Sequence, residues 1–219
     1  MRAASGAVVM LTAEVPMSAA ARLRTTYADY LRDEELASER HAFHDGETYA
    51  MAGGSTVHAL LATEVVRAFG NALVGRPCAA VGADQRVCID EDHATYPDVA
   101  VLCPPIERPP HDPHAVTNPT VIVEVLSPST ELWDRSGKFA LYARLGSLQH
   151  YVLVAQDRWS VEHLRRMDDG AWRLTVHGPG DVLVLDAVDV RVSVDELYAK
   201  VEAFGGPGRD AKPAGPPRG

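Results

Sequence analysis

Cysteine is scarce in this chain of 219 residues, which contains only three. Cys78, Cys88 and Cys103 are odd in number, and none belongs to a C-x-x-C pair. The pattern predicts neither a disulfide framework nor a zinc site. We therefore expect buried thiols in a reducing compartment, and the cytoplasm is the location that this favours.

Long hydrophobic runs are also missing. The longest apolar run near the start, from Ala7 to Leu11, is far shorter than the ~20 residues that cross a bilayer, and Glu14 and Pro16 follow it closely. We expect no membrane partner and no secretory signal, which again favours the cytoplasm.

Positive charge is in deficit, because 21 Lys and Arg residues stand against 30 Asp and Glu residues, for a formal net charge of −9. A protein that holds nucleic acid by neutralising phosphates over a broad face usually carries the opposite sign. The balance argues against a general DNA binder. It does not exclude a nuclease, since carboxylates that hold a metal are themselves acidic.

Length and composition predict one folded domain with its own core, because hydrophobic residues make up 46% of the chain and charged residues 23%. Residues 1–24 are Ala-rich without a clean period and predict a flexible N-terminal segment. Residues 205–219, GGPGRDAKPAGPPRG, predict a disordered Pro/Gly tail. The domain is therefore expected at residues 25–204.

Helical and strand patterns are interspersed along that domain and predict a mixed α/β class, with a curved β-sheet flanked by helices. Ser55 and Ser193 are expected to cap two of the helices. Helices are expected at residues 26–36, 55–73, 134–145 and 193–201. Strands are expected around Phe43 and Tyr49, joined by an Asp45-Gly46 turn, and at residues 78–81, 86–89, 99–102, 120–126, 151–154, 159–164, 172–176 and 182–185.

The first candidate for chemistry is Glu124, which interrupts the apolar run VIVEVL at residues 121–126. Such a run is typical of a central strand covered on both faces. An ionised carboxylate there is costly unless a metal, a cation or a hydrogen-bond network compensates it, so the position favours function over structure.

Asp98 follows Pro97 at the start of the apolar strand expected at residues 99–102. Alone, it is explained as a turn or strand-start residue. Together with Glu124 on a neighbouring strand, it offers the pair of hard oxygen ligands that Mg²⁺ uses with water and phosphate oxygens. Mn²⁺ is the alternative cation.

A third candidate is Lys138, four residues after Asp134 at the start of an expected helix. A surface ion pair at this spacing is common and contributes little, and taken alone it is the favoured explanation. The turn at residues 127–130 would, however, carry this helix back beside the end of the Glu124 strand. That position favours a role for Lys138 in the same site.

Three segments occur in order with characteristic spacing: YPDVAVL at residues 96–102, VIVEVLSPST at 121–130 and WDRSGKFALYARLGSLQHYVLV at 133–154. Together with Asp45-Gly46-Glu47 and Met51-Ala52-Gly53, they resemble the Uma-two family of restriction endonuclease-like proteins, a branch of the PD-(D/E)xK nuclease superfamily. The likeness runs from about Tyr27 to Tyr198. It implies a restriction-endonuclease-like core and a Mg²⁺- or Mn²⁺-dependent endonuclease that acts on DNA.

The resemblance implies that Asp98 and Glu124 hold the divalent cation and that Lys138 is the lysine of the superfamily motif. In the standard E-x-K arrangement that lysine stands two residues after the glutamate, where this chain has Leu126. The segment before the D-G-E hairpin also departs from many relatives, because Ala42 stands where they have a glutamate. That difference keeps an inactive nuclease fold among the alternatives.

Other sites are weaker. His111 and His114 lie in a proline-rich loop without a third ligand, which argues against zinc. The three tryptophans, Trp133, Trp159 and Trp172, are better explained by packing than by base stacking. No Gly-rich phosphate loop, dinucleotide fingerprint or G-x-S-x-G motif occurs.

Three classes of function therefore remain. The leading one is a metal-dependent DNA endonuclease. The second is an inactive nuclease fold that serves as a nucleic-acid- or protein-binding module. The third is an unrelated α/β interaction protein whose buried acid is structural. A homodimer is an option that the sequence leaves open.

Overall fold

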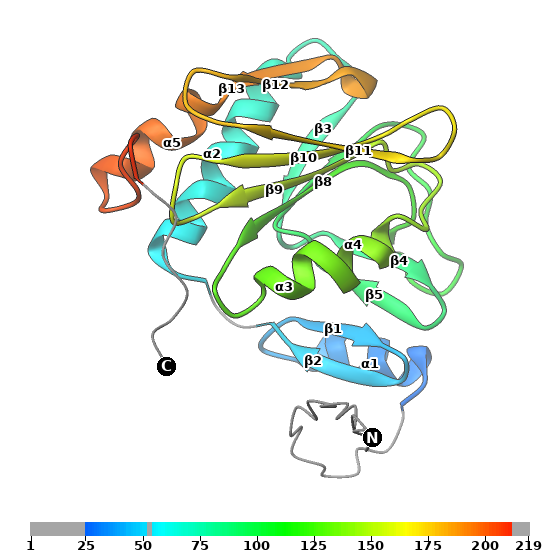
Figure 1. The fold of residues 1–219 in the computed structure, drawn as a ribbon. Helices are drawn as coiled ribbons and strands as arrows, with labels where there is room; N and C mark the ends of the chain where they lie inside the picture. Colours follow the sequence, from blue (N-terminus) through cyan, green and yellow to red (C-terminus); the bar gives the residue numbers. More distant parts are fainter. Residues whose placement is uncertain (1–24, 52–53, 212–219) are drawn as a thin grey trace, which may run out of the picture.

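The computed structural model describes residues 25–51 and 54–211. The predicted flexible segment at residues 1–24, Ala52 and Gly53 of the Met-Ala-Gly turn, and residues 212–219 of the predicted tail lie outside the described residues. A six-stranded sheet forms the centre of the described part (Figure 1), in the order β11-β10-β9-β8-β6-β3. Its strands are β3 (Ala79–Gly82), β6 (Val99–Leu102), β8 (Pro119–Leu126), β9 (His150–Ala155), β10 (Val161–Arg166) and β11 (Trp172–His177).

The neighbours in this sheet are antiparallel, apart from the parallel pair β8 and β9. The crossover between β8 and β9 contains α3 (Glu131–Trp133), the π-helical turn η1 (Asp134–Lys138) and α4 (Phe139–Tyr142). A parallel pair requires such a crossover because its strands point the same way. The single helix predicted at residues 134–145 is therefore a composite that begins three residues earlier and ends at Tyr142.

A second sheet has the order β2-β1-β5-β4-β7, and a separate hairpin pairs β12 with β13. The strands of the second sheet are β1 (His41–His44), β2 (Glu47–Ala50), β4 (Arg86–Asp90), β5 (His93–Thr95) and β7 (Ala115–Val116); those of the hairpin are β12 (Val182–Leu185) and β13 (Val190–Ser193), with the 3-10 turn η2 (Asp186–Val188) between them. The predicted α/β class with a mixed sheet flanked by helices is confirmed. Strands β5, β7 and β13 were not predicted; β5 and β7 are too short to show a period.

Three longer helices are α1 (Tyr27–Leu36), α2 (Thr56–Ala72) and α5 (Val194–Ala203). Ser55 Oγ accepts a hydrogen bond from the His58 amide at 3.1 Å, and Ser193 Oγ accepts one from the Glu196 amide at the same distance. Both serines therefore cap helices as predicted. None of the helices in the described residues combines the length and the apolar character needed to cross a membrane.

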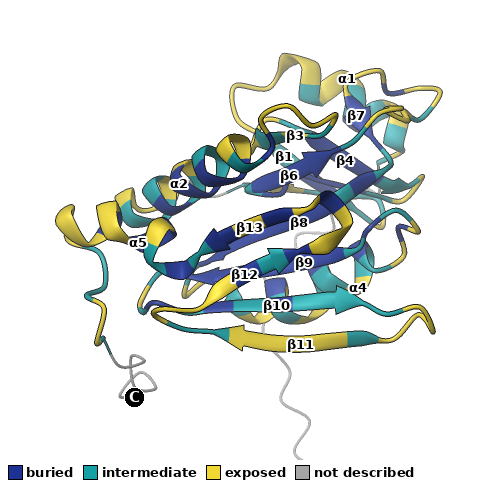
Figure 2. Ribbon diagram, turned by 90° about the horizontal axis from the view of Figure 1, so that it is seen from above, coloured by how far each residue is buried: buried dark blue, intermediate teal, exposed yellow. Residues whose placement is uncertain are grey.

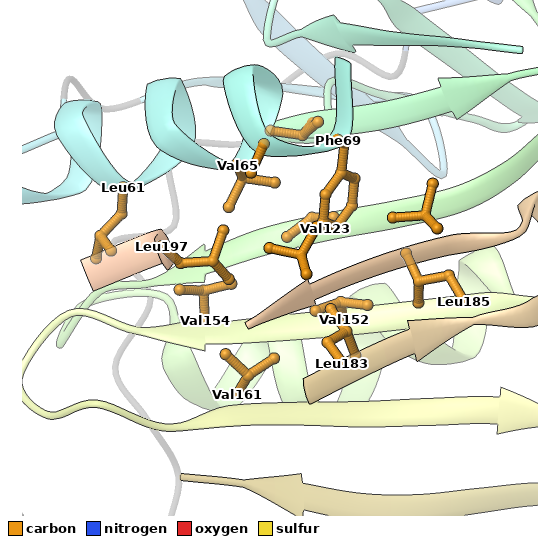
Figure 3. Close-up of a cluster of buried hydrophobic side chains, with 14 of the residues drawn as sticks. Leu61, Val65, Phe69, Val123, Val152, Val154, Val161, Leu183, Leu185 and Leu197 are labelled. Atoms are coloured by element: carbon orange, nitrogen blue, oxygen red, sulfur yellow. The ribbon is translucent and has the colours of Figure 1, made fainter. Parts of the chain in front are cut away.

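The central sheet separates two layers of core, and the alternation along β8 shows which side chains enter each layer. Val121, Val123 and Val125 enter the layer formed with α2, α5 and the β12–β13 hairpin. Figure 3 shows Val123 within this layer. Ile122 and Leu126 enter the opposite layer, beside α4 and β4. The strands of the sheet centre are buried along most of their length, whereas β11 at the edge is largely exposed (Figure 2).

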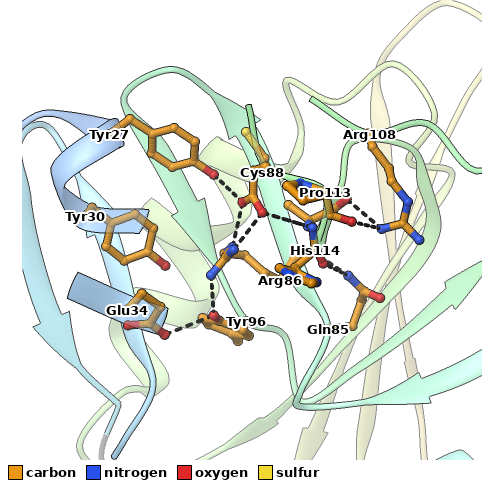
Figure 4. A network of polar contacts seen from close by, with 12 residues as sticks. Tyr27, Tyr30, Glu34, Gln85, Arg86, Cys88, Tyr96, Arg108, Pro113 and His114 are labelled. Atoms are coloured by element: carbon orange, nitrogen blue, oxygen red, sulfur yellow. Dashed lines mark hydrogen bonds and ion pairs between the residues drawn. The ribbon is translucent and has the colours of Figure 1, made fainter. Parts of the chain in front are cut away.

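A buried polar network docks α1 onto the second sheet (Figure 4). Arg86 forms two hydrogen bonds of 2.7 Å with Asp112, which also accepts a 2.8 Å bond from the Tyr27 hydroxyl. Arg86 donates to the Tyr96 hydroxyl at 2.9 Å, and that hydroxyl donates to Glu34 at 3.0 Å. Because charged hydrogen bonds with paired geometry are strong when buried, this network fixes the sheet that carries the β1–β2 hairpin.

Cys78 and Cys103 are joined by a disulfide, so the prediction that all three cysteines are free thiols was wrong. Strand β3 pairs with β6 so that Ala79 faces Leu102, and the two cysteines are the next pair outward. Their Cα atoms lie 4.2 Å apart although 25 residues separate them in sequence. Strand pairing creates this proximity, and the linear spacing of the cysteines does not reveal it. Cys88 is a free, buried thiol, as predicted.

Candidate active site

A cavity of about 960 Å³ lies where β6 begins and β8 ends. Its walls come from the β1–β2 hairpin, the start of α2, the end of β8 and the segment from Ser127 to Lys138. All three residues singled out in the sequence, Asp98, Glu124 and Lys138, line this one cavity.

Strand register places Asp98 and Glu124 opposite each other. Val99 pairs with Val123 in the antiparallel pair β6–β8, so the next position outward sets Asp98 against Glu124. Directly opposed residues of an antiparallel pair have neighbouring side chains on one face of the sheet. Asp98 is further fixed by the amide of Val125, which donates to its Oδ2 at 2.7 Å.

Lys138 reaches the buried carboxylate from the π-helical turn. Its Nζ lies 2.7 Å from Oε1 of Glu124 and 3.7 Å from Oδ1 of Asp134. Lys138 is only 8% exposed and Glu124 only 2%. The simple explanation of Lys138 and Asp134 as a surface i,i+4 ion pair is therefore wrong, because all three charged groups are inside the cavity wall.

The burial of these charged groups shifts the pKa values of Glu124 and Lys138. Burial raises the pKa of Glu124, against the opposing charge of Lys138. The nearby carboxylates of Asp98 and Asp134 raise it further, since like charges disfavour ionisation. Burial alone would lower the pKa of Lys138, but the surrounding carboxylates outweigh it and raise that pKa above its usual value. Lys138 is therefore a fixed positive charge.

Sequence reasoning missed His58, in the first turn of α2. Its Nε2 lies 3.2 Å from Oδ2 of Asp98, and it lines the same cavity. The interaction with Asp98 raises the pKa of His58, against the effect of burial. No spacing in the sequence connects residue 58 with residue 98. The contact arises only because α2 starts beside Asp98, the residue that precedes β6.

The structure also shows where Ala42, which stands in place of the expected glutamate, lies relative to the cavity. Ala42 is buried and lines the same cavity as Asp98 and Glu124, so a longer side chain at this position would face that cavity. Glu47, the acid of the D-G-E hairpin, lines the cavity as well and could supply a carboxylate there. Asp84 pairs instead with Arg40 at 2.8 Å and is not part of the cavity wall.

The donor set fits a hard divalent cation. Within residues 25–51 and 54–211, no group of three or more His, Cys, Asp or Glu side chains is arranged as a complete metal cage. Mg²⁺ is commonly held by one or two carboxylates and completes its shell with water and phosphate oxygens. Asp98 and Glu124 supply that minimum. Burial is the main cause of the raised pKa of Glu124, and a cation would relieve the smaller contribution that comes from the neighbouring carboxylates.

Comparison with known proteins gives three kinds of match. A family model described as "Uma2: Putative restriction endonuclease" matches residues 27–195. The "Uncharacterized protein slr1290" of Synechocystis sp. is 37% identical over 171 residues, which cover 78% of this chain and 89% of the relative. The "Uncharacterized protein sll1609" of the same organism is 36% identical over 151 residues, covering 68% of this chain and 85% of the relative.

Among solved structures, the crystal structure of a "putative nuclease belonging to DUF820" from Anabaena variabilis superposes with a TM-score of 0.65. It shares 18% sequence identity, and the match covers 80% of this chain and 98% of the other. The similarity shows a shared fold and agrees with the nuclease-like core predicted from the sequence.

Proposed function

Because the chain belongs to the Uma2 family, described as "Putative restriction endonuclease", we propose that it is a metal-dependent endonuclease that hydrolyses phosphodiester bonds of DNA. The observation that carries the proposal is the meeting of Asp98, Glu124 and Lys138 in one cavity, with Lys138 Nζ 2.7 Å from Glu124 Oε1. Membership of the family also removes the third alternative, an unrelated interaction protein.

In this proposal Asp98 and Glu124 hold Mg²⁺ or Mn²⁺. When bound, such a cation supplies Lewis-acid charge and lowers the pKa of an attacking water. Lys138 adds a fixed positive charge in the same cavity, where the phosphoryl oxygens gain negative charge during hydrolysis. The Val125 amide and His58 both contact Oδ2 of Asp98, and they would hold this carboxylate in one orientation toward the metal.

The second candidate is an inactive nuclease fold that binds nucleic acid or protein. One observation favours it: Ala42 presents only a methyl group to the cavity, at the position where the family resemblance implies a glutamate. The two candidates share the same fold and the same cavity. They differ only in whether the site catalyses cleavage of DNA.

A cleavage assay tests the proposal directly. The full chain is incubated with supercoiled, linear duplex and single-stranded DNA in the presence of Mg²⁺, Mn²⁺ or a chelator. We expect cleavage that requires the metal and falls by at least about a hundredfold in Asp98→Asn and Glu124→Gln. Cleavage that persists in the double variant would rule out the proposed mechanism.

Thermal unfolding gives a second readout that does not depend on turnover. Metal at about 100 times its Kd should stabilise the fold by about 2.7 kcal/mol through mass action. Glu124→Gln should remove most of this gain. Asp84→Asn is the matched control, because it neutralises a carboxylate outside the cavity wall and should keep the full gain. Metal stabilisation without cleavage would favour the inactive alternative.

The cytoplasmic location and the homodimer stay predictions. The disulfide between Cys78 and Cys103 weighs against a reducing compartment, because disulfides are rare there. Fractionation of the native host and sedimentation of the purified chain are the measurements that check them.

A further inference from the structure

One tryptophan of the three departs from the packing role that the sequence favoured. Trp159 is only 7% exposed and stacks on Tyr198 at 5.5 Å. Trp172 packs edge-on against Phe139 at 5.3 Å. Trp133, by contrast, is 46% exposed and lines the cavity that holds the carboxylates. A large exposed ring beside a candidate active site requires an explanation other than core packing.

The ring of Trp133 is nonetheless held in place. A Cβ added to Gly137 would lie 1.9 Å from Cζ3 of the indole, so the ring lies directly against the backbone of the next turn. The ring of His44 meets it edge-on at 5.7 Å. The indole is therefore fixed in orientation while nearly half of its surface stays open, which is the arrangement of a preformed contact surface.

Two further rings extend this surface across the cavity wall. Tyr49 on β2 lies 5.8 Å from His44, and both residues line the cavity with Trp133. Tyr49 is 40% exposed, and its hydroxyl donates to Glu47 at 2.7 Å, which fixes the ring. Burial lowers the pKa of His44 to about 4, so at neutral pH it is an uncharged aromatic ring.

The charges of the cavity indicate what these rings can hold. Five acidic residues line it, namely Asp45, Glu47, Asp98, Glu124 and Asp134, whereas Lys138 is the one Lys or Arg among its lining residues. Phosphate neutralisation can therefore contribute little affinity at this wall. Stacking of a base on an aromatic ring needs no such neutralisation, but it needs the face of the base to be accessible. In a paired duplex, neighbouring bases cover that face.

We propose that Trp133, together with His44 and Tyr49, is a stacking subsite for an unpaired base of a DNA strand whose backbone passes Asp98, Glu124 and Lys138. The preferred substrate is then single-stranded DNA, or an unpaired segment within a duplex. This inference rests on the proposed function, since it names the form of substrate that the same site takes.

Binding without metal tests the subsite separately from turnover. The full chain in chelator is titrated with three labelled probes: a short oligothymidylate, an abasic strand of the same length and a fully paired duplex closed at both ends by abasic linkers. We expect the oligothymidylate to bind about tenfold tighter than either of the others, the order that one stacked base contributes. It should also quench part of the tryptophan fluorescence.

Substitutions at the ring identify its contribution. Trp133→Ala should weaken oligothymidylate binding about tenfold, abolish the quench and leave the closed duplex unaffected, whereas Trp133→Phe should keep most of the affinity. Gly137→Ala, which displaces the ring, should resemble Trp133→Ala. The matched control is Leu132→Ala, because Leu132 is an 82% exposed apolar neighbour outside the cavity wall. Thermal unfolding of each variant confirms that it is folded.

Equal affinity for the three probes, tighter binding of the closed duplex, or an unchanged affinity in Trp133→Ala would overturn the inference. The outcomes separate it from the proposed function. Base-dependent binding without any metal-dependent cleavage would remove the endonuclease proposal alone. Metal-dependent cleavage that is equal on paired and unpaired DNA, together with binding that Trp133→Ala leaves unchanged, would remove the stacking subsite alone.

Discussion

The ammonium group of Lys138 lies 2.7 Å from Oε1 of Glu124, with both side chains buried. The pair connects the central strand β8 to the π-helical turn of the crossover that follows it. Two opposite charges removed from water together offset much of each other's desolvation cost, whereas either one alone is left with the full cost. The site is therefore also a structural element, and variants there must be judged for stability as well as activity.

We predict that Lys138→Met lowers the free energy of unfolding by about 3 kcal/mol at neutral pH, the low end of the range for a broken buried pair. The loss is limited because burial favours the neutral form of Glu124, which can take up a proton once the lysine is gone. Urea unfolding measures the effect. The double variant Glu124→Gln, Lys138→Met should cost less than the sum of the single variants, and strict additivity would show that the two groups do not interact.

Ala42→Glu should increase metal-dependent DNA cleavage, because it adds to the cavity wall the carboxylate that the family resemblance implies at this position. Ala42→Gln is the control for size and polarity and should give no gain. The gain should also vanish in combination with Glu124→Gln, since both residues would act on one metal. A chain whose cleavage is indifferent to Ala42→Glu does not need an acid at this position.

Reduction of the disulfide between Cys78 and Cys103 should destabilise the chain by about 2–4 kcal/mol, because the link closes a loop across 25 residues. The Cys78→Ser, Cys103→Ser double variant should lose the same amount and become insensitive to reductant. Chemical unfolding with and without dithiothreitol measures both. Cys88→Ala is the control, since it leaves the reductant effect in place; mass spectrometry that found three free thiols in the native chain would contradict the prediction.

Lowering the pH from 6.5 to 4.5 should remove on the order of 3 kcal/mol of stability through His150 and His163. Burial lowers the pKa of each to about 4, and their rings are in contact, with Nδ1 of His150 2.9 Å from Nε2 of His163. The unfolded chain binds these protons near pH 6.5 while the folded chain resists until about pH 4, so stability is present above 6.5 and falls below it.

The measurement is the difference in thermal unfolding between the wild type and the His150→Gln, His163→Gln double variant across that range. The difference is needed because Glu124, with its raised pKa, contributes the opposite slope in both proteins. The double variant should show the smaller loss on acidification. Parallel profiles would show that the histidines do not titrate as their burial requires.

The elements of the fold could mostly be predicted where a period or a cap is present. Helix α2 and strand β8 show long apolar patterns, and Ser55 and Ser193 mark helix starts by their side-chain chemistry. The short strands β5 and β7 have no such pattern. They exist because neighbouring strands supply partners for their backbone groups.

The sequence by itself determined the family, the mixed α/β class and the exceptional position of Glu124, because a charge in an apolar strand is costly wherever the chain folds. Only the tertiary structure decided which groups meet that charge. Strand register sets Asp98 opposite Glu124, the crossover brings Lys138 to 2.7 Å, and the start of α2 adds His58 beside Asp98. The same pairing joined Cys78 to Cys103, and folding left Trp133 exposed at the cavity. These contacts join residues far apart in the chain, and local patterns carry no information about distances that depend on how strands pair and helices pack.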